Sequence, residues 1–275
     1  MTTITENIQT LRSIKSDIKN AITDKGGNVG NDFKTYAQAI TNLPSGGGNE
    51  DLVNLIERDV TSFTIPDGIT KIGNYAFSYC TSLTDITMPD SVTSIGEYSF
   101  FRCSLTDVTI GNGVTTIGSN AFYFCEALTS VTIPDSVTKI GYNTFAYCKA
   151  LTSIIIPDSV TNIGSNSFQD CTSLTDVTIG NGVTSISTYA FAGCSKLPSV
   201  ILPSTVKYIG SGIFNYCSSL TSITVLATTP PTLGSSAFDN TNNCPIYVPA
   251  ESVDAYKTAT NWSKYADRIQ AIPTV

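Results

Sequence analysis

Residues 128–148 read LTSVTIPDSVTKIGYNTFAYC and show the pattern from which the fold can be predicted. Its first half places Leu128, Val131 and Ile133 at spacings of three and then two. A spacing of two is typical of a short β-strand whose alternate side chains point into a core. Pro134 ends the strand, because proline cannot donate a hydrogen bond to a β-ladder. The second half returns to the core through four further apolar residues, Val137, Ile140, Phe145 and Cys148.

The same pattern recurs along most of the chain. Successive cysteines lie 23, 22, 23, 23, 23, 23 and 27 residues apart, and a phenylalanine precedes each of the first seven by three residues. A coil of this length buries too few side chains to fold alone, but stacked coils share a continuous core. The periodicity therefore predicts a solenoid with one short β-strand in each 23-residue coil. The cysteines are Cys80, Cys103, Cys125, Cys148, Cys171, Cys194, Cys217 and Cys244.

This pattern resembles the BspA-like branch of leucine-rich repeats, with its recurring L-T-x-V-x-I-P-x-S-V-x-x-I-G-x-x-A-F-x-x-C, over about residues 60–245. The resemblance implies a leucine-rich-repeat solenoid, which we place at residues 52–227. We expect residues 228–275 to form a degenerate repeat and a C-terminal cap. The cap should contain a last strand at 246–248 and an amphipathic helix at about 250–261. With a helical segment before the solenoid, the expected fold class is an α+β repeat protein.

The helical segment is expected at residues 1–44, as a small hairpin that a glycine-rich linker at 45–51 joins to the solenoid. Apolar side chains of its first helix recur at alternating spacings of four and three, which is typical of a coiled-coil seam. The hairpin either closes on itself or borrows apolar surface from a partner, because about fifty residues make a poor core alone. We expect a homo-oligomer, with a trimer favoured, or docking into a larger assembly. The candidate oligomerisation and anchor residues are Ile4, Ile8, Leu11, Ile14, Ile18 and Ile22.

The N-terminal segment also suggests a setting. The layout IKxDIKxAIxxKG, followed by YAxxI and a glycine run, resembles N-terminal segments of bacteriophage tail, baseplate and fibre-type proteins over residues 4–48. This resemblance implies a virion protein, of the fibre or decoration type, made in the host cytoplasm. Residues 1–44 would then contact other virion proteins, while the solenoid would bind a protein or a bacterial surface glycan.

The alternative is a BspA-like adhesin on the bacterial cell surface, bound to host matrix. That interpretation needs a signal peptide or a lipoprotein cysteine. Residues 1–25 lack the basic, apolar and small-residue layout of a signal peptide, so we expect the virion interpretation to hold.

Composition argues against an enzyme. The 275 residues include no histidine, which removes Ser-His-Asp and Cys-His catalysis and every histidine metal ligand. We therefore expect no catalytic residues, no metal and no cofactor. The formal charge is −7, from 15 basic and 22 acidic side chains, and it would repel a nucleic acid. No apolar run reaches the ~18 residues of a membrane-spanning helix, so we expect no membrane partner either.

The cysteine spacing indicates buried thiols. Each cysteine falls at the same point of its coil, which predicts one inward-facing column of small apolar side chains. Neighbouring coils lie ~5 Å apart, within reach of a disulfide, so chance pairing is a hazard under oxidising conditions. This favours assembly in a reducing cytoplasm.

A cluster of aromatic residues is the candidate binding surface. Aromatic side chains gather around the phenylalanine position in the first four coils, and the repeat itself does not require them. Exposed aromatic patches often mark an interface, although the rings could equally shield the convex side of the solenoid. We expect the patch to contact a virion neighbour or a receptor glycan. Its candidate residues are Tyr75, Tyr79, Tyr98, Phe101, Arg102, Tyr123, Phe124, Tyr142 and Tyr147.

Overall fold

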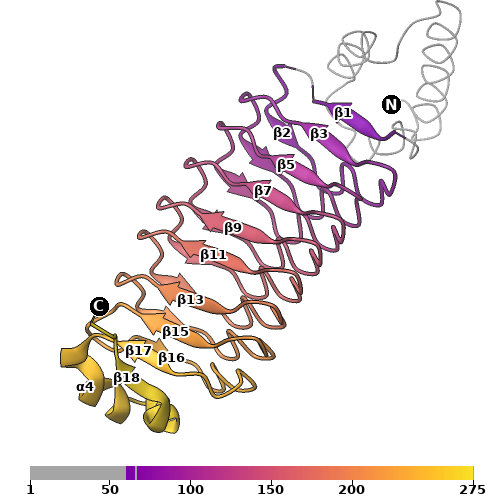
Figure 1. Cartoon of the computed structure of the whole chain (residues 1–275). Coiled ribbons are helices and arrows are strands. Elements are labelled where there is room, and N and C mark those ends of the chain that lie inside the picture. Colours follow the sequence, from indigo (N-terminus) through magenta and orange to yellow (C-terminus); the bar gives the residue numbers. More distant parts are fainter. Residues whose placement is uncertain (1–59, 66, 275) are drawn as a thin grey trace, which may run out of the picture. The chain divides into compact units, whose positions relative to one another are not determined.

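The computed structural model describes residues 60–65 and 67–274, which belong to one compact unit, Glu57–Val275. The hairpin expected at 1–44 and the linker expected at 45–51 lie outside the described residues, so both stay predictions. In the described part the chain winds into a β-solenoid of nine successive coils, each about 23 residues long (Figure 1).

The first strand of each coil lies beside the equivalent strand of its neighbours (Figure 1). All the pairs are parallel, and in most of these strands buried side chains alternate with more exposed ones, whereas β18 has one buried residue followed by two exposed ones. The strands fall into three sheets, ordered β1-β3-β5-β7, β11-β9 and β13-β15-β17-β18. Their bounds are β1 Ser62–Thr64, β3 Asp85–Thr87, β5 Asp107–Thr109, β7 Ser130–Thr132, β9 Ser153–Ile156, β11 Asp176–Ile179, β13 Ser199–Leu202, β15 Ser222–Val225, β17 Ile246–Val248 and β18 Ile269–Ala271.

A second strand in each of the first eight coils corrects the prediction of one strand per coil. Two residues around the recurring isoleucine extend far enough to pair with the next coil, as Ile140 of β8 does with Ile163 of β10. A two-residue strand has no alternation of its own, so periodicity could not reveal it. These strands form the sheets β2-β4-β6 and β16-β14-β12-β10-β8. Their bounds are β2 Lys71–Ile72, β4 Ser94–Ile95, β6 Thr116–Ile117, β8 Lys139–Ile140, β10 Asn162–Ile163, β12 Ser185–Ile186, β14 Tyr208–Ile209 and β16 Thr232–Leu233.

A turn segment after the second strand completes each coil and is also hydrogen-bonded to its neighbour. The backbone N–H groups of Tyr75, Phe77 and Tyr79 donate to carbonyl oxygens of the next coil at 2.9, 2.7 and 2.7 Å. Backbone polar groups on this side of the solenoid are therefore satisfied without a regular strand.

Two columns of side chains fill the core as the sequence predicts. Phenylalanine rings stack from Phe77 to Phe238, with successive centroids 5.0–6.3 Å apart and planes within 20°. The cysteines are buried beside them. The Sγ of Cys125 donates to the carbonyl oxygen of Phe100 in the preceding coil at 3.0 Å, and Cys103, Cys148, Cys171, Cys194 and Cys217 make the equivalent contact.

The C-terminal end is covered by three short helices and a strand. The predicted last strand is confirmed as β17, but the helix expected at about 250–261 is shorter, because Ala259 is extended and ends it. The 3-10 helix η1 (Ala250–Ser252) runs into α4 (Val253–Thr258), and the 3-10 helix η2 (Trp262–Arg268) leads into β18, which sequence analysis missed. The indole of Trp262 is buried, contacts the ring of Phe238 and donates to the carbonyl oxygen of Pro231 at 2.8 Å.

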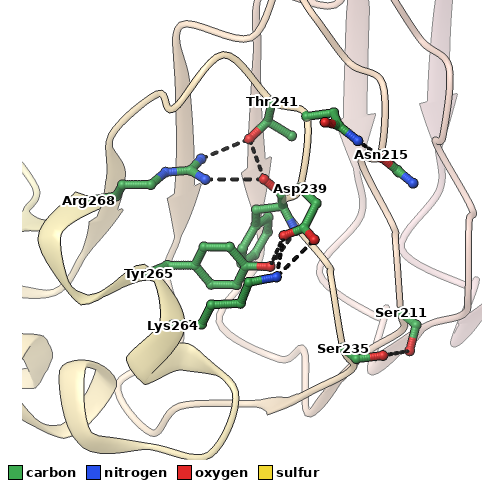
Figure 2. Close-up of polar contacts among 10 residues, drawn as sticks. Ser211, Asn215, Ser235, Asp239, Thr241, Lys264, Tyr265 and Arg268 are labelled. Carbon is green, nitrogen blue, oxygen red and sulfur yellow. Dashed lines mark hydrogen bonds and ion pairs between the residues drawn. The ribbon is translucent and has the colours of Figure 1, made fainter.

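A guanidinium fastens this cap to the last coil (Figure 2). Arg268 donates to the carbonyl oxygen of Cys244 at 2.8 Å, to that of Phe238 at 3.1 Å and to the Thr241 hydroxyl at 2.9 Å. Beside it, Lys264 and the Tyr265 hydroxyl both donate to the Asp239 carboxylate, and the hydrogen bond from Lys264 holds the pKa of that carboxyl below its usual value.

Candidate functional site

The candidate site lies on the turn segments of the first four phenylalanine-bearing coils. Eight of the nine predicted residues are brought together there as one network, which we call the aromatic patch. It consists of Tyr75, Tyr79, Tyr98, Phe101, Arg102, Tyr123, Phe124 and Tyr147.

Ring contacts join the patch across four coils. At one end Tyr75 stacks on Tyr98 with centroids 5.1 Å apart, and Tyr98 meets the edge of Phe101 at 5.7 Å. Phe101 stacks on Tyr123 at 5.5 Å, and Tyr123 contacts Phe124 at 4.6 Å. At the far end Phe124 stacks on Tyr147. Tyr75 and Tyr79 are 45% and 47% exposed, so the network borders solvent and is no part of the core.

Arg102 lies in the middle of these rings. Its guanidinium carbon is 5.1 Å from the centroid of Phe124, 5.6 Å from that of Phe101 and 5.9 Å from that of Tyr79. All three distances fall within the range of a cation–π contact. The residue is exposed, and in the described part of the chain its guanidinium makes no hydrogen bond or ion pair.

The backbone under the patch is unusual in a regular way. In every coil from Phe77 to Phe238, the residues two before and two after the phenylalanine have positive φ, and we call these the flanking positions. Asparagine, aspartate and glycine tolerate this region, whereas a bulky residue there is an outlier. Six patch residues occupy flanking positions, with φ between 54° and 61°: Tyr75, Tyr79, Tyr98, Arg102, Phe124 and Tyr147.

The repeat pattern of this chain is shared with known proteins. A family model described as BspA type leucine rich repeat region matches residues 56–172 and 138–261, which is well over half of the chain. The chain belongs to the BspA-type leucine-rich repeat family. No curated protein matches it.

Two solved structures resemble the BspA-type solenoid. A leucine-rich repeat protein from Bacteroides ovatus is 30% identical, with a TM-score of 0.63 over 67% of this chain and 48% of that one. The chain thus spans about half the length of that structure. The leucine-rich repeat protein of T. pallidum is 30% identical, with a TM-score of 0.54 over 59% of this chain and 78% of that one.

The family match begins at residue 56 and so does not reach residues 4–48, on which the resemblance to bacteriophage proteins depends. Nothing in the comparisons supports the expected virion function. The candidate anchor residues from Ile4 to Ile22 lie outside the described residues, and their role stays a prediction.

Outside the patch, the structure differs from two sequence-based expectations for the BspA-type coils. Tyr142 is 50% exposed and close enough to Tyr123 to affect its pKa, but no ring contact joins it to the network. Aromatic residues at these positions are also not confined to the first four coils, where we expected them to gather. Tyr189 and Tyr216 occupy flanking positions of later coils and are 43% and 66% exposed. Both tyrosines are visible in the sequence, two residues before Phe191 and two residues after Phe214.

The electrostatics of the patch depend on Arg102. Burial, followed by the nearby Asp170 carboxylate, raises the pKa of Tyr147. Burial is also the main cause of the raised pKa of Tyr123, followed by its neighbours Tyr142 and Tyr98. Both phenols are therefore neutral at neutral pH, so the guanidinium of Arg102 is the charged group among the patch residues.

Two further features bear on function. In residues 60–65 and 67–274, no group of three or more potential ligand side chains is placed to hold a metal ion. None of the helices in that part has both the length and the hydrophobicity that a bilayer crossing requires.

Proposed function

We propose that the chain is a non-enzymatic binding protein of the BspA-like adhesin kind, displayed on a bacterial surface and attached to its target through the aromatic patch. The family match supports this interpretation over a virion protein, because BspA-like adhesins were the alternative that the repeat pattern implied.

One observation carries the proposal: bulky side chains occupy strained backbone positions and form a continuous network of exposed and half-buried side chains. Asn166 and Gly193 show which residue types these positions accept without strain. Strain of this kind persists where the surrounding structure enforces it, and it clusters at functional sites. Tyrosine and arginine are also the residue types enriched at the centres of protein interfaces.

The buried thiols do not oppose a surface location. Burial raises the pKa of the Cys125 thiol to about 12, so the reactive thiolate is scarce at neutral pH. Each bonded thiol is also held by a carbonyl oxygen of the preceding coil. The folded solenoid therefore protects its thiols, and the earlier preference for a reducing compartment applies to the unfolded chain.

Location is tested by peptide mass spectrometry of the envelope fraction of the source culture and of purified viral particles. We expect peptides of the solenoid in the envelope fraction. Their presence in particles together with peptides from residues 1–25 would replace the adhesin proposal with the virion interpretation.

Attachment is tested with the full chain on a panel of immobilised host matrix proteins and glycans. We expect Tyr123→Ser combined with Tyr147→Ser to weaken attachment while the far-UV spectrum stays native. The matched control is Tyr216→Ser, which removes an exposed tyrosine outside the patch. Equal attachment by the unaltered chain, the double variant and Tyr216→Ser would refute the patch as the binding surface.

A further inference from the structure

Arg102 differs from the other arginine of the described residues in what it contacts. Arg268 donates to two carbonyl oxygens and a hydroxyl of the last coil and contacts one ring, that of Tyr265. Arg102 contacts three rings, and within residues 60–65 and 67–274 none of its guanidinium N–H groups has an acceptor. The aromatic patch thus holds a cation in place with its hydrogen-bonding capacity unused.

The rings also restrict the side chain. A free arginine side chain loses rotamer entropy when a partner fixes it. Contacts with Tyr79, Phe101 and Phe124 have already restricted Arg102, so a partner that binds it loses less. The planar guanidinium presents paired N–H groups, which match the two oxygens of a carboxylate.

The net charge of the chain also limits which class of anionic partner can bind. A net charge of −7 disfavours a long polyanion such as an acidic polysaccharide. One carboxylate set among apolar atoms fits a single cation within a network of rings. Protein interfaces have this composition, with tyrosine and arginine at their centres.

We propose that Arg102 is a specificity-determining residue of the patch, which accepts a partner protein segment carrying a carboxylate beside an apolar side chain. The carboxylate can belong to aspartate, glutamate or a chain end. This proposal rests on the proposed function, since it names the class of partner for the same surface.

The test selects binders to the full chain from a display library of random peptides. We expect the selected peptides to be enriched in aspartate or glutamate next to aromatic or aliphatic residues. Arg102→Met should weaken a selected peptide about tenfold or more, the range for a charge-assisted hydrogen-bonded pair. Replacing the peptide acid by its amide should weaken binding to the unaltered protein equally, and should cost nothing further in the Arg102→Met variant. Lys139→Met makes the same change in net charge outside the patch and should leave binding unchanged.

Three other outcomes would overturn the inference. Peptides that lose binding with Tyr123→Ser and Tyr147→Ser but contain no acid would refute the role of Arg102 and leave the proposed function standing. Peptides indifferent to those two variants would refute the patch itself. If no peptide binds, and hyaluronan binds the unaltered protein but not Arg102→Met, the partner is an acidic glycan.

Discussion

The ring of Phe124 lies parallel to the ring of Tyr147, with centroids 4.4 Å apart and planes 3° from each other. The two residues are two positions after the phenylalanine of neighbouring coils, and both have positive φ. Because every coil repeats the same backbone, residues in one column of the aligned repeats project in parallel and meet. Tyr75 and Tyr98 stack for the same reason in the other column. A column of the repeat alignment is therefore a row of neighbours on the surface.

We expect Phe124→Asn to weaken attachment strongly and to lower stability moderately. The variant loses ring contacts with Tyr147, Tyr123 and Phe101, each worth about 0.5–1.5 kcal/mol, and relief of backbone strain of about 1 kcal/mol offsets only part of that loss. Loss of a central aromatic side chain of an interface typically costs about 2 kcal/mol of binding free energy. Urea unfolding and attachment of the full chain to matrix proteins measure the two effects.

Tyr216→Asn is the control for that variant. Tyr216 has φ 62° and is 66% exposed, so asparagine relieves strain without loss of packing. We expect stability to rise by about 0.5–1 kcal/mol and attachment to stay unchanged. A fall in stability would mean that the backbone at flanking positions is not strained.

The core could be predicted from sequence because each of its features repeats. Cysteine and phenylalanine recur at the same positions of each repeat, as at Cys148 and Phe145. Because the coils stack in register, residues that share a repeat position form one continuous column in the core. The patch could be predicted in the same way, from aromatic residues that depart from the repeat. The hydrogen bond from the Cys125 thiol to Phe100 could not, since it depends on how neighbouring coils are offset.

The remaining differences have local causes. The periodicity of apolar residues carries no information on φ. The only indication in the sequence that Tyr79 has a left-handed backbone is that asparagine and glycine occupy the equivalent position of other coils. β18 was missed because its pairing with β17 depends on a turn through η2 that no repeat encodes. The end of a solenoid has a sequence that does not recur, so repeat periodicity cannot predict its structure.

The buried thiols should make stability fall in alkali. Burial raises the pKa of Cys125 from 9.0 to about 12, so the folded state binds the thiol proton more tightly than the unfolded chain does. That stabilisation is complete below pH 9 and is lost as the pH rises from 9 toward 12. Urea unfolding across this interval should show the decline.

A matched variant separates the thiol from other groups. Cys125→Ala should cost about 1 kcal/mol at neutral pH, for a lost hydrogen bond and a small cavity. Its stability should then decline less steeply with pH than that of the unaltered chain. Parallel declines would show that Cys125 does not titrate on unfolding, and rapid labelling of native thiols at neutral pH would argue against their burial.

Gly182 allows two neighbouring coils to approach each other. A Cβ at this position would collide with the backbone carbonyl oxygen of Asp158. The backbone cannot easily shift away, because the adjacent Asn181 N–H donates to the Asp158 carboxylate at 2.6 Å. We expect Gly182→Ala to destabilise the solenoid by about 3 kcal/mol, the upper end for overpacking. The equivalent residue of the preceding coil is Ser159, whose hydroxyl donates to Val137 at 2.7 Å. Ser159→Ala should cost only about 1 kcal/mol, and equal costs in thermal unfolding would contradict the steric argument.

Arg268 should be the most sensitive polar residue of the cap. Its guanidinium serves three acceptors at once, two of them carbonyl oxygens of the last coil, and the compact ammonium of lysine cannot reproduce that geometry (Figure 2). We expect Arg268→Lys to lower the free energy of unfolding by about 2 kcal/mol and to expose the end of the solenoid to self-association. Lys264→Met removes an exposed ion pair to Asp239 and should have a much smaller effect. Urea unfolding and light scattering of the two variants decide the point: if Arg268→Lys is no more damaging than Lys264→Met, the cap is held by the burial of Trp262 and its neighbours and not by the guanidinium.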